Sequence, residues 1–145
     1  MKVQDILQKK SSDVFTVRPH QTLNEASQIL ATHNIGSLVV VNEQQHVIGI
    51  LSERDIVRQL AQKGEQVGSL TVGEVMTREV VIAVPDDDLA YLSNTMTNNR
   101  IRHLPVLNQG ELVGIVSIGD VVKAQLNFYE GEAHSLQQYI TGDYT

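Results

Sequence analysis

Short apolar runs alternate along the chain with longer stretches in which apolar residues recur at helical spacing. In the first half, the runs at residues 14–17, 37–41 and 47–51 have the length of strands. Apolar positions at helical spacing fill residues 23–30 and 56–61. The pattern therefore predicts the order strand, helix, strand, strand, helix.

Polar residues mark the ends of these predicted elements. Thr22 and Glu25 have the spacing of a capping box, which favours a helix start there. Residues 34–36 (Asn-Ile-Gly) end that helix, Ser52 begins the next one, and Gly64 follows its last turn. We therefore expect two helices in the first half, each with its own start and stop signal.

The whole pattern is written twice, with a period of about 65 residues. Residues 49–55 (GILSERD) return as 114–120 (GIVSIGD), and the run at 35–41 is answered by 101–107. The second set of elements is expected at residues 80–84, 89–96, 104–107 and 112–116, with a helix from Ile118. Solenoid repeats are shorter, roughly 20 to 50 residues. Each copy is therefore predicted to be half of a two-lobed α/β (α+β) fold with pseudo-symmetric repeats.

The repeat also sets the predicted organisation of the chain. Repeat 1 covers residues 1–63, a polar connection covers 64–71 and repeat 2 covers 72–127. Because residues 72–76 echo residues 3–7, a short lead-in helix is expected in each copy.

A C-terminal helix or tail, residues 128–145, has no counterpart in the first copy. Its apolar positions, with those just before it, indicate a long final helix and a further stripe beyond Gly131; they are Val121, Val122, Leu126, Phe128, Leu136, Tyr139 and Ile140. Such a stripe must cover either the chain's own body or another subunit. The sequence of the stripe does not decide between them.

Composition removes several classes of function. The chain has 145 residues, 41% of them hydrophobic, no cysteine and a net charge of −6. Disulfides, thiolate metal sites and a cysteine nucleophile are excluded. The negative charge argues against general nucleic-acid binding, which depends on clustered Lys and Arg. No apolar run approaches the ~20 residues of a membrane span, so we expect no membrane contact and a cytoplasmic location.

The repeated phrase places a serine and, three residues later, an aspartate at the start of a helix. Ser52 with Asp55, and Ser117 with Asp120, have the spacing of a capping box, which is a purely structural reading. A second reading is that each carboxylate accepts hydrogen bonds from the two neighbouring hydroxyls of a ribose. Both readings can hold together.

Charge decides which part of a nucleotide could lie at these aspartates. A bare helix N-terminus attracts phosphate, but an aspartate already there repels a second anion. The sugar diol therefore suits this place, and phosphate must be held elsewhere by basic side chains. Arg54, Arg102 and His103 are the best candidates.

Other chemistry finds little support. Residues 86–88 (Asp-Asp-Asp) stand where the first copy begins a helix, so we interpret them as a helix cap and expect no metal site. The histidines lack zinc-site spacing, and neither a nucleophile elbow nor a phosphate loop of the Walker type is present. We expect no catalytic residue and no enzymatic activity.

Residues 14–19, 35–41 and 49–55, their second copies, and Arg-His-Leu-Pro-Val at 102–106 together carry a family resemblance. Over about residues 1–127 the chain resembles a tandem cystathionine-beta-synthase (CBS) domain pair, or Bateman module, and as a whole it looks like the small stand-alone bacterial CBS-pair proteins. The resemblance implies a regulatory sensor of adenosine-containing ligands such as AMP, ADP, ATP, NAD or S-adenosylmethionine. It also implies two possible sites in the cleft between the repeats. Together with the apolar tail, it leads us to expect a homodimer.

By the same resemblance, Ser52 and Asp55 would serve one ribose, and Ser117 and Asp120 the other. The positions that match the adenine and phosphate pockets are Thr16, Ile35, Gly36, Ser37, Ile82, Ile101, Arg102 and His103. Arg54 and Pro105 complete the expected set of binding residues.

The two copies differ where a ligand would be held. Gly36-Ser37 in the first copy stands against Arg102-His103 in the second, and Arg54 stands against Gly119. We therefore expect inequivalent sites, one of them weak or empty. For the regulatory module, an output partner is expected that the sequence does not identify. The alternative is a structural interaction module with empty clefts.

Overall fold

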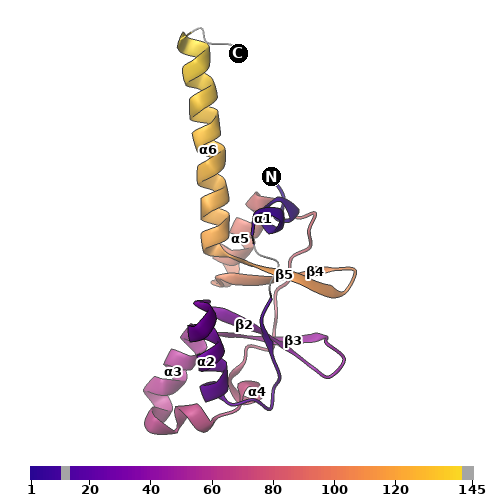
Figure 1. Cartoon of the computed structure of the whole chain (residues 1–145), viewed down its shortest axis with the longest axis vertical. Helices are drawn as coiled ribbons and strands as arrows, with labels where there is room; N and C mark the ends of the chain where they lie inside the picture. The colour runs from indigo at the N-terminus through magenta and orange to yellow at the C-terminus, as the bar shows by residue number, and fades with distance from the viewer. Residues whose placement is uncertain (11–13, 142–145) are drawn as a thin grey trace.

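The computed structural model describes the backbone of residues 1–10 and 14–141, and the side chains of these residues up to Glu132. Two halves, each a small sheet covered by helices, lie one above the other, and one long helix projects away from them (Figure 1). In chain order the elements are α1 (Val3–Lys9), β1 (Thr16–Val17), α2 (Leu23–His33), β2 (Ser37–Val41), β3 (Val47–Ser52), α3 (Glu53–Lys63), a 3-10 helix η1 (Gly64–Ser69), α4 (Val72–Val75), α5 (Leu89–Asn99), β4 (His103–Asn108), β5 (Glu111–Ser117) and α6 (Ile118–Thr141). The predicted mixed fold with two similar halves is confirmed.

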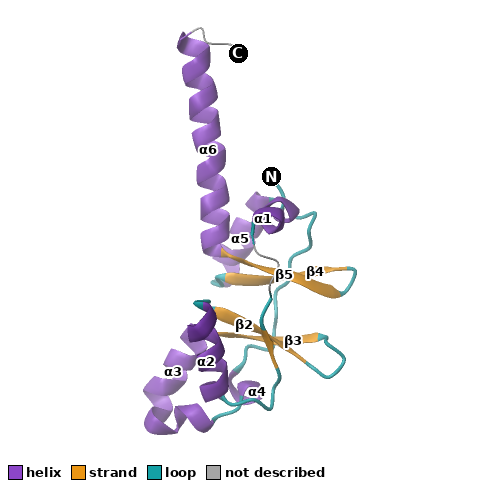
Figure 2. Ribbon diagram, in the orientation of Figure 1, coloured by secondary structure: helices purple, strands orange, loops and turns teal. Residues whose placement is uncertain are grey.

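The two sheets repeat the same register. In the first half, β1 runs parallel to β2, and β2 pairs with β3 in antiparallel fashion so that Ser37 lies opposite Ser52. In the second half, β4 and β5 form the same antiparallel pair, with His103 opposite Ser117. Figure 2 shows the two sheets facing each other between the two groups of helices.

The first strand of each copy is shorter than predicted. The strand expected at residues 14–17 is reduced to β1, and the one expected at 80–84 is reduced to a single parallel bridge between Ala83 and Val106. Ala83 donates to Pro105 O and accepts from Leu107 N, both at 2.9 Å. Because Pro105 has no N–H to donate on that side, the pairing cannot extend to the residues before Ala83.

Side chains cap the helices as the sequence indicated. Thr22 Oγ1 accepts a hydrogen bond from Glu25 N at 3.1 Å at the start of α2. Asp88 Oδ1 does the same for Tyr91 N at 2.8 Å at the start of α5, so the interpretation of the acidic run as a helix cap is confirmed. Asn34 ends α2 in a left-handed conformation with φ of 52°.

The two lead-in helices are exchanged between the halves. Val3 and Ile6 of α1 are buried in the core of the second half, whereas Val72 of α4 is buried in the core of the first. Backbone bonds hold each helix to the other copy, from Val3 N to Asp87 O at 2.9 Å and from Val72 N to Gln21 O at 2.8 Å. Each core therefore contains residues from both repeats.

The final helix α6 passes through Gly131 without a break, although the sequence suggested a second stripe beyond it. Val122, Leu126, Phe128 and Tyr129 are exposed on it. The stripe predicted at Leu136, Tyr139 and Ile140 lies outside the described side chains. Among the described residues, no helix combines the length and the apolar character needed to cross a bilayer.

Candidate functional site

Each copy of the repeated phrase forms a complete capping box. Asp55 N donates to Ser52 Oγ at 3.2 Å, and Ser52 N donates to Asp55 Oδ2 at 2.9 Å. Ser117 and Asp120 make the same pair of bonds at 3.1 and 2.8 Å. Within the described residues, no hydrogen bond reaches Oδ1 of either aspartate. The structural reading of the motif therefore holds, and each carboxylate keeps one oxygen for a further donor.

A cleft beside Asp55 is built from both halves of the molecule. Its first-half wall comes from Gly36, the end of β3 and the first turns of α3, while its second-half wall comes from the segment after α4 and the end of α5. The lining residues are Gly36, Ile50, Ser52, Glu53, Arg54, Asp55, Arg58, Thr77, Glu79, Val80, Val81, Arg100, Ile101, Arg102 and His103. Apolar side chains thus lie next to four arginines and three carboxylates.

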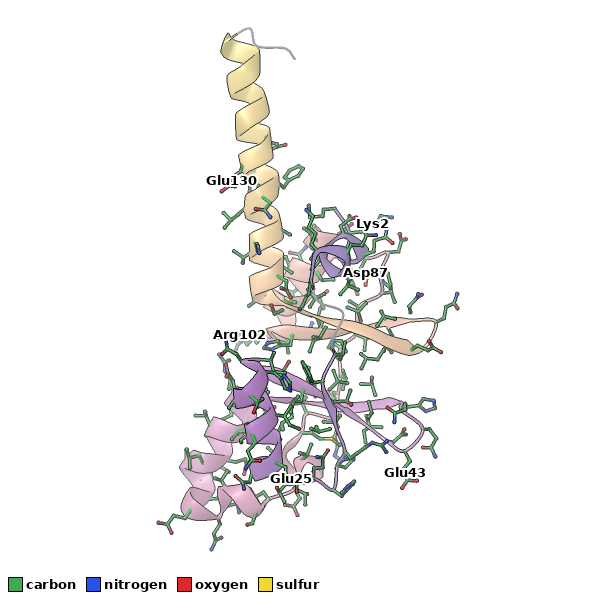
Figure 3. All side chains as sticks on the ribbon, viewed as in Figure 1. Lys2, Glu25, Glu43, Asp87, Arg102 and Glu130 are labelled. Carbon is green, nitrogen blue, oxygen red and sulfur yellow. The ribbon has the colours of Figure 1, made fainter. Side chains whose placement is uncertain are left out.

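Two of these arginines, Arg58 and Arg100, were not among the binding residues predicted from the sequence. Arg58 follows Asp55 by three residues, so both side chains lie on one face of α3. Arg100 ends α5 in a left-handed conformation, at the place where Asn34 ends α2. Figure 3 shows Arg102 at the level where the two halves meet. The helical spacing of Arg58 from Asp55 was the available signal for the first of them.

Two cavities lie on the side of Asp120. One is lined by Lys10, Val14, Phe15, Asn34, Ile35, Gly36, Ser37, His103, Ile115 and Ser117. The other is lined by Met1, Asp5, Ile6, Lys9, Lys10, Asp120, Lys123, Ala124 and Asn127. Lys10 belongs to both, and its Nζ donates to Asp120 Oδ2 and to Ile115 O, each at 2.7 Å.

Burial of the Asp120 carboxyl raises its pKa, but the hydrogen bond from Lys10 and those of Ser117 outweigh that effect. The net pKa is below the usual value, so the carboxylate stays ionised at neutral pH. Asp120 is thus already neutralised by a cation, whereas no salt bridge to Asp55 occurs among the described residues.

His103 lines both the cleft beside Asp55 and one of the cavities on the side of Asp120. A Cβ added to Gly36 would stand 3.3 Å from His103 Nε2, so the glycine leaves the ring its room. Burial lowers the pKa of His103; Glu53 and Asp120 oppose the shift, and Lys10 and Arg102 add to it. The imidazole is therefore neutral at pH 7, able to donate one hydrogen bond and accept another.

The structure brings most of the predicted site residues together in two groups. Those beside Asp55 are Gly36, Ser52, Arg54, Asp55, Ile101, Arg102 and His103. Those on the other side are Ile35, Gly36, Ser37, His103, Ser117 and Asp120. Thr16, Ile82 and Pro105 line none of these three cavities. Phe15 and Val81, one residue earlier than Thr16 and Ile82, line them instead because side chains alternate in extended backbone.

Comparison with known proteins identifies the repeat. The family model described as CBS domain matches residues 3–62 and 72–127. A CBS domain-containing protein of Arabidopsis thaliana, CBSX3, mitochondrial, is 39% identical over 85% of this chain, and the match spans 62% of that protein. The CBS domain-containing protein YhcV of Bacillus subtilis is 38% identical over 81% of this chain and 82% of its own length.

Solved structures share the fold over nearly the whole chain. The CBS-domain containing protein ATU1752 from Agrobacterium tumefaciens has a TM-score of 0.83 and 41% identity over 86% of this chain and 92% of its own. The CBS domain pair of protein MJ0100, in complex with 5-methylthioadenosine and S-adenosyl-L-methionine, has a TM-score of 0.77 and 30% identity over 91% and 98%. The chain belongs to the CBS-domain family and carries two CBS domains as a tandem pair.

Proposed function

We propose that this protein is a non-catalytic regulatory module that binds an adenosine-containing nucleotide in the cleft beside Asp55. The observation that carries the proposal is the composition of that cleft, where a carboxylate with a free oxygen lies beside apolar side chains and arginines. We propose the same division of the chain as the sequence predicted: repeats at 1–63 and 72–127, a connection at 64–71 and a tail at 128–145.

Three parts of the cleft suit three parts of such a ligand. Val80, Val81 and Ile101 provide an apolar wall for the purine. Oδ1 of Asp55 accepts hydrogen bonds from the ribose hydroxyls, since Oδ2 is used by Ser52 N. The arginines supply donors for phosphate oxygens.

The choice among adenosine ligands follows from charge. Arg54, Arg58, Arg100 and Arg102 line the cleft, and such guanidinium groups favour a ligand with a phosphate group. AMP, ADP, ATP and NAD satisfy this condition. S-adenosylmethionine carries a sulfonium cation in place of phosphate, so it should bind here more weakly. The ligands of the MJ0100 structure support recognition of adenosine but not of phosphate.

Regulation requires that binding be passed on to another molecule. A ligand held by both halves favours one relative orientation of them, and a partner can read that orientation. We propose a homodimer as the working form, because α6 leaves Val122, Leu126 and Tyr129 exposed at spacings of four and three residues. That spacing is typical of a helix that packs along a second helix. A cytoplasmic location and an unidentified output partner complete the proposal.

The second candidate function is a structural interaction module. It is favoured by the two capping boxes, which form completely from protein groups alone and so give Ser52, Asp55, Ser117 and Asp120 a role without any ligand. Under this alternative both clefts remain empty and only the exposed surfaces act.

A thermal-shift panel separates the two candidates. Purified protein is heated with adenosine, AMP, ATP, NAD, S-adenosylmethionine and, as a purine control, GMP. A ligand present at 100 times its Kd should add about 2.7 kcal/mol to stability. Stabilisation by the phosphorylated adenosines but not by GMP supports the nucleotide proposal. If no compound changes the unfolding midpoint at millimolar concentration, the nucleotide proposal is wrong and the structural interaction module is the better account.

A further inference from the structure

The pseudo-symmetric halves differ in one feature that bears on binding. Beside Asp55 the cleft is continuous and includes both the aspartate and the apolar wall. On the side of Asp120, one cavity is lined by Ser117 and apolar residues, and a separate one between α1 and α6 includes Asp120. Lys10, at the end of α1, is the residue that both cavities share.

Lys10 makes two contacts between these cavities. Its Nζ donates both to Ile115 O, in β5, and to Oδ2 of Asp120, at the start of α6. In the other half, the equivalent carbonyl of Ile50 instead accepts a backbone hydrogen bond from Thr77 N at 2.9 Å. The side chain of Lys10 thus occupies a place that no lysine occupies beside Asp55.

The ion pair is well placed to compete with a sugar. The side chains of Lys10 and Asp120 are 30% and 25% exposed, so water screens the pair less than a fully exposed one. A ribose diol approaching Asp120 would have to share the carboxylate with an ammonium group that already donates to it at 2.7 Å. Hydrogen bonds between two charged groups are stronger than those from a neutral hydroxyl.

We propose that Lys10 closes the second cleft to nucleotides, so that the cleft beside Asp55 fills first and the one beside Asp120 fills only when Lys10 leaves its carboxylate. The inference rests on the proposed function, because it concerns the order in which two nucleotide sites are filled. It assigns to Lys10 the role of deciding which of the two clefts is available at low ligand concentration.

The test compares three proteins by calorimetric titration with AMP. Lys10→Met keeps the apolar stem of the side chain but removes the ammonium group, and Lys63→Met makes the same charge change at an exposed position outside all three cavities. Wild type and Lys63→Met should bind one AMP per chain with a second site at least tenfold weaker. Lys10→Met should tighten that second site about tenfold, which is about 1.4 kcal/mol. The double variant Lys10→Met/Asp120→Asn should return to one site.

A second readout needs no ligand. The titration of the Asp120 carboxyl, followed by carbon NMR, should move to higher pH in Lys10→Met because the cation that lowers its pKa is gone. If the first site binds AMP in all proteins but the second is unchanged or weaker in Lys10→Met, the closing role of Lys10 is wrong and the proposed function stands. If no protein binds AMP at any site while the Asp120 titration still moves, the ion pair is real but both the nucleotide proposal and the closing role are overturned.

Discussion

The side chain of Met76 lies directly on the backbone of Gly49, so closely that a Cβ at position 49 would stand 2.5 Å from Met76 Sδ. Gly114 has the same relationship to Leu7, with a Cβ–Cδ2 separation of 2.6 Å. Both contacts join the second long strand of one half to the lead-in helix that packs on it. The glycine that opens each repeated phrase therefore serves the exchange of α1 and α4 rather than ligand binding.

Alanine at Gly49 should destabilise the protein more than alanine at Gly114. Gly49→Ala puts a Cβ against Met76 Sδ and 3.1 Å from the carbonyl oxygen of Thr77, and overpacking of this kind costs about 1–3 kcal/mol. Gly114→Ala meets only the side chain of Leu7, whose methyl groups can shift, so its cost should be smaller. Urea denaturation followed by circular dichroism measures the effect. Gly131→Ala is the matched control, since nothing lies within 4 Å of its added Cβ in α6 and alanine is the better helix former. Equal stability for all three variants would contradict the packing role.

Removing Arg102 should separate phosphate from nucleoside recognition. A hydrogen bond to a charged group contributes about 1.5–3 kcal/mol, so Arg102→Gln should weaken AMP binding by roughly tenfold or more while leaving adenosine binding nearly unchanged. Calorimetry with both compounds gives the ratio. Lys63→Gln makes the same charge change outside the cleft and should alter neither affinity. A parallel loss for AMP and adenosine would show that Arg102 does not contact phosphate.

The lowered pKa of His103 predicts that the stability of the protein depends on pH. Its pKa in the folded protein lies below the usual value of about 6.5, so below that pH the unfolded chain binds more protons than the folded one. Stability should fall as the pH decreases from about 6.5 toward the folded pKa. The other charged groups that act on this ring are Glu53, Asp120, Lys10 and Arg102.

The measurement is the urea midpoint of wild type and His103→Gln at several pH values between 7.5 and 5. The variant should lose less stability than wild type on acidification, because one group with a lowered pKa has been removed while the other histidines are common to both. Parallel curves would mean that His103 is not held neutral by the fold.

The exposed face of α6 should hold two chains together. Light scattering after size exclusion is expected to give about 32 kDa, twice the 16.0 kDa of one chain. The double variant Leu126→Glu/Tyr129→Glu places charges on side chains that are 56% and 62% exposed, and should give a folded monomer. Glu130→Gln on the same helix should remain a dimer. A monomeric wild type would remove the homodimer from the proposal.

The sequence alone predicted the order of the elements and the repeated capping motif, because both depend on residues that are close together in the chain. Ser52 with Asp55 signals its own helix start, and the periodic apolar runs predict strands and helices in the right order. The loss of the first strand in the second copy was not predicted. Pro105 has this effect only because the segment around Ala83 pairs on the side where an N–H of residue 105 would be needed, and the sequence does not show which segment pairs there.

The contacts inside the site could not be predicted, because they join residues that are distant in sequence. Lys10 and Asp120 are 110 residues apart, and no periodicity indicates that one would reach the other. The exchange of α1 and α4 is equally long-range, so the partners of Gly49 and Gly114 could not be inferred although the repeated glycines were visible. The sequence predicted inequivalent sites from Arg102-His103 and Arg54, and the contact of Lys10 with Asp120 adds a difference that depends on long-range packing.

Titration of wild type and Asp55→Asn with AMP is the most direct test of a ribose held by a carboxylate. An asparagine oxygen can still accept from Ser52 N, so the helix cap and the unfolding free energy should change little. The charged acceptor for the ribose hydroxyls is lost, and AMP should bind about tenfold more weakly or worse. Equal AMP affinity in the two proteins, with equal stability, would contradict the role of Asp55 in binding.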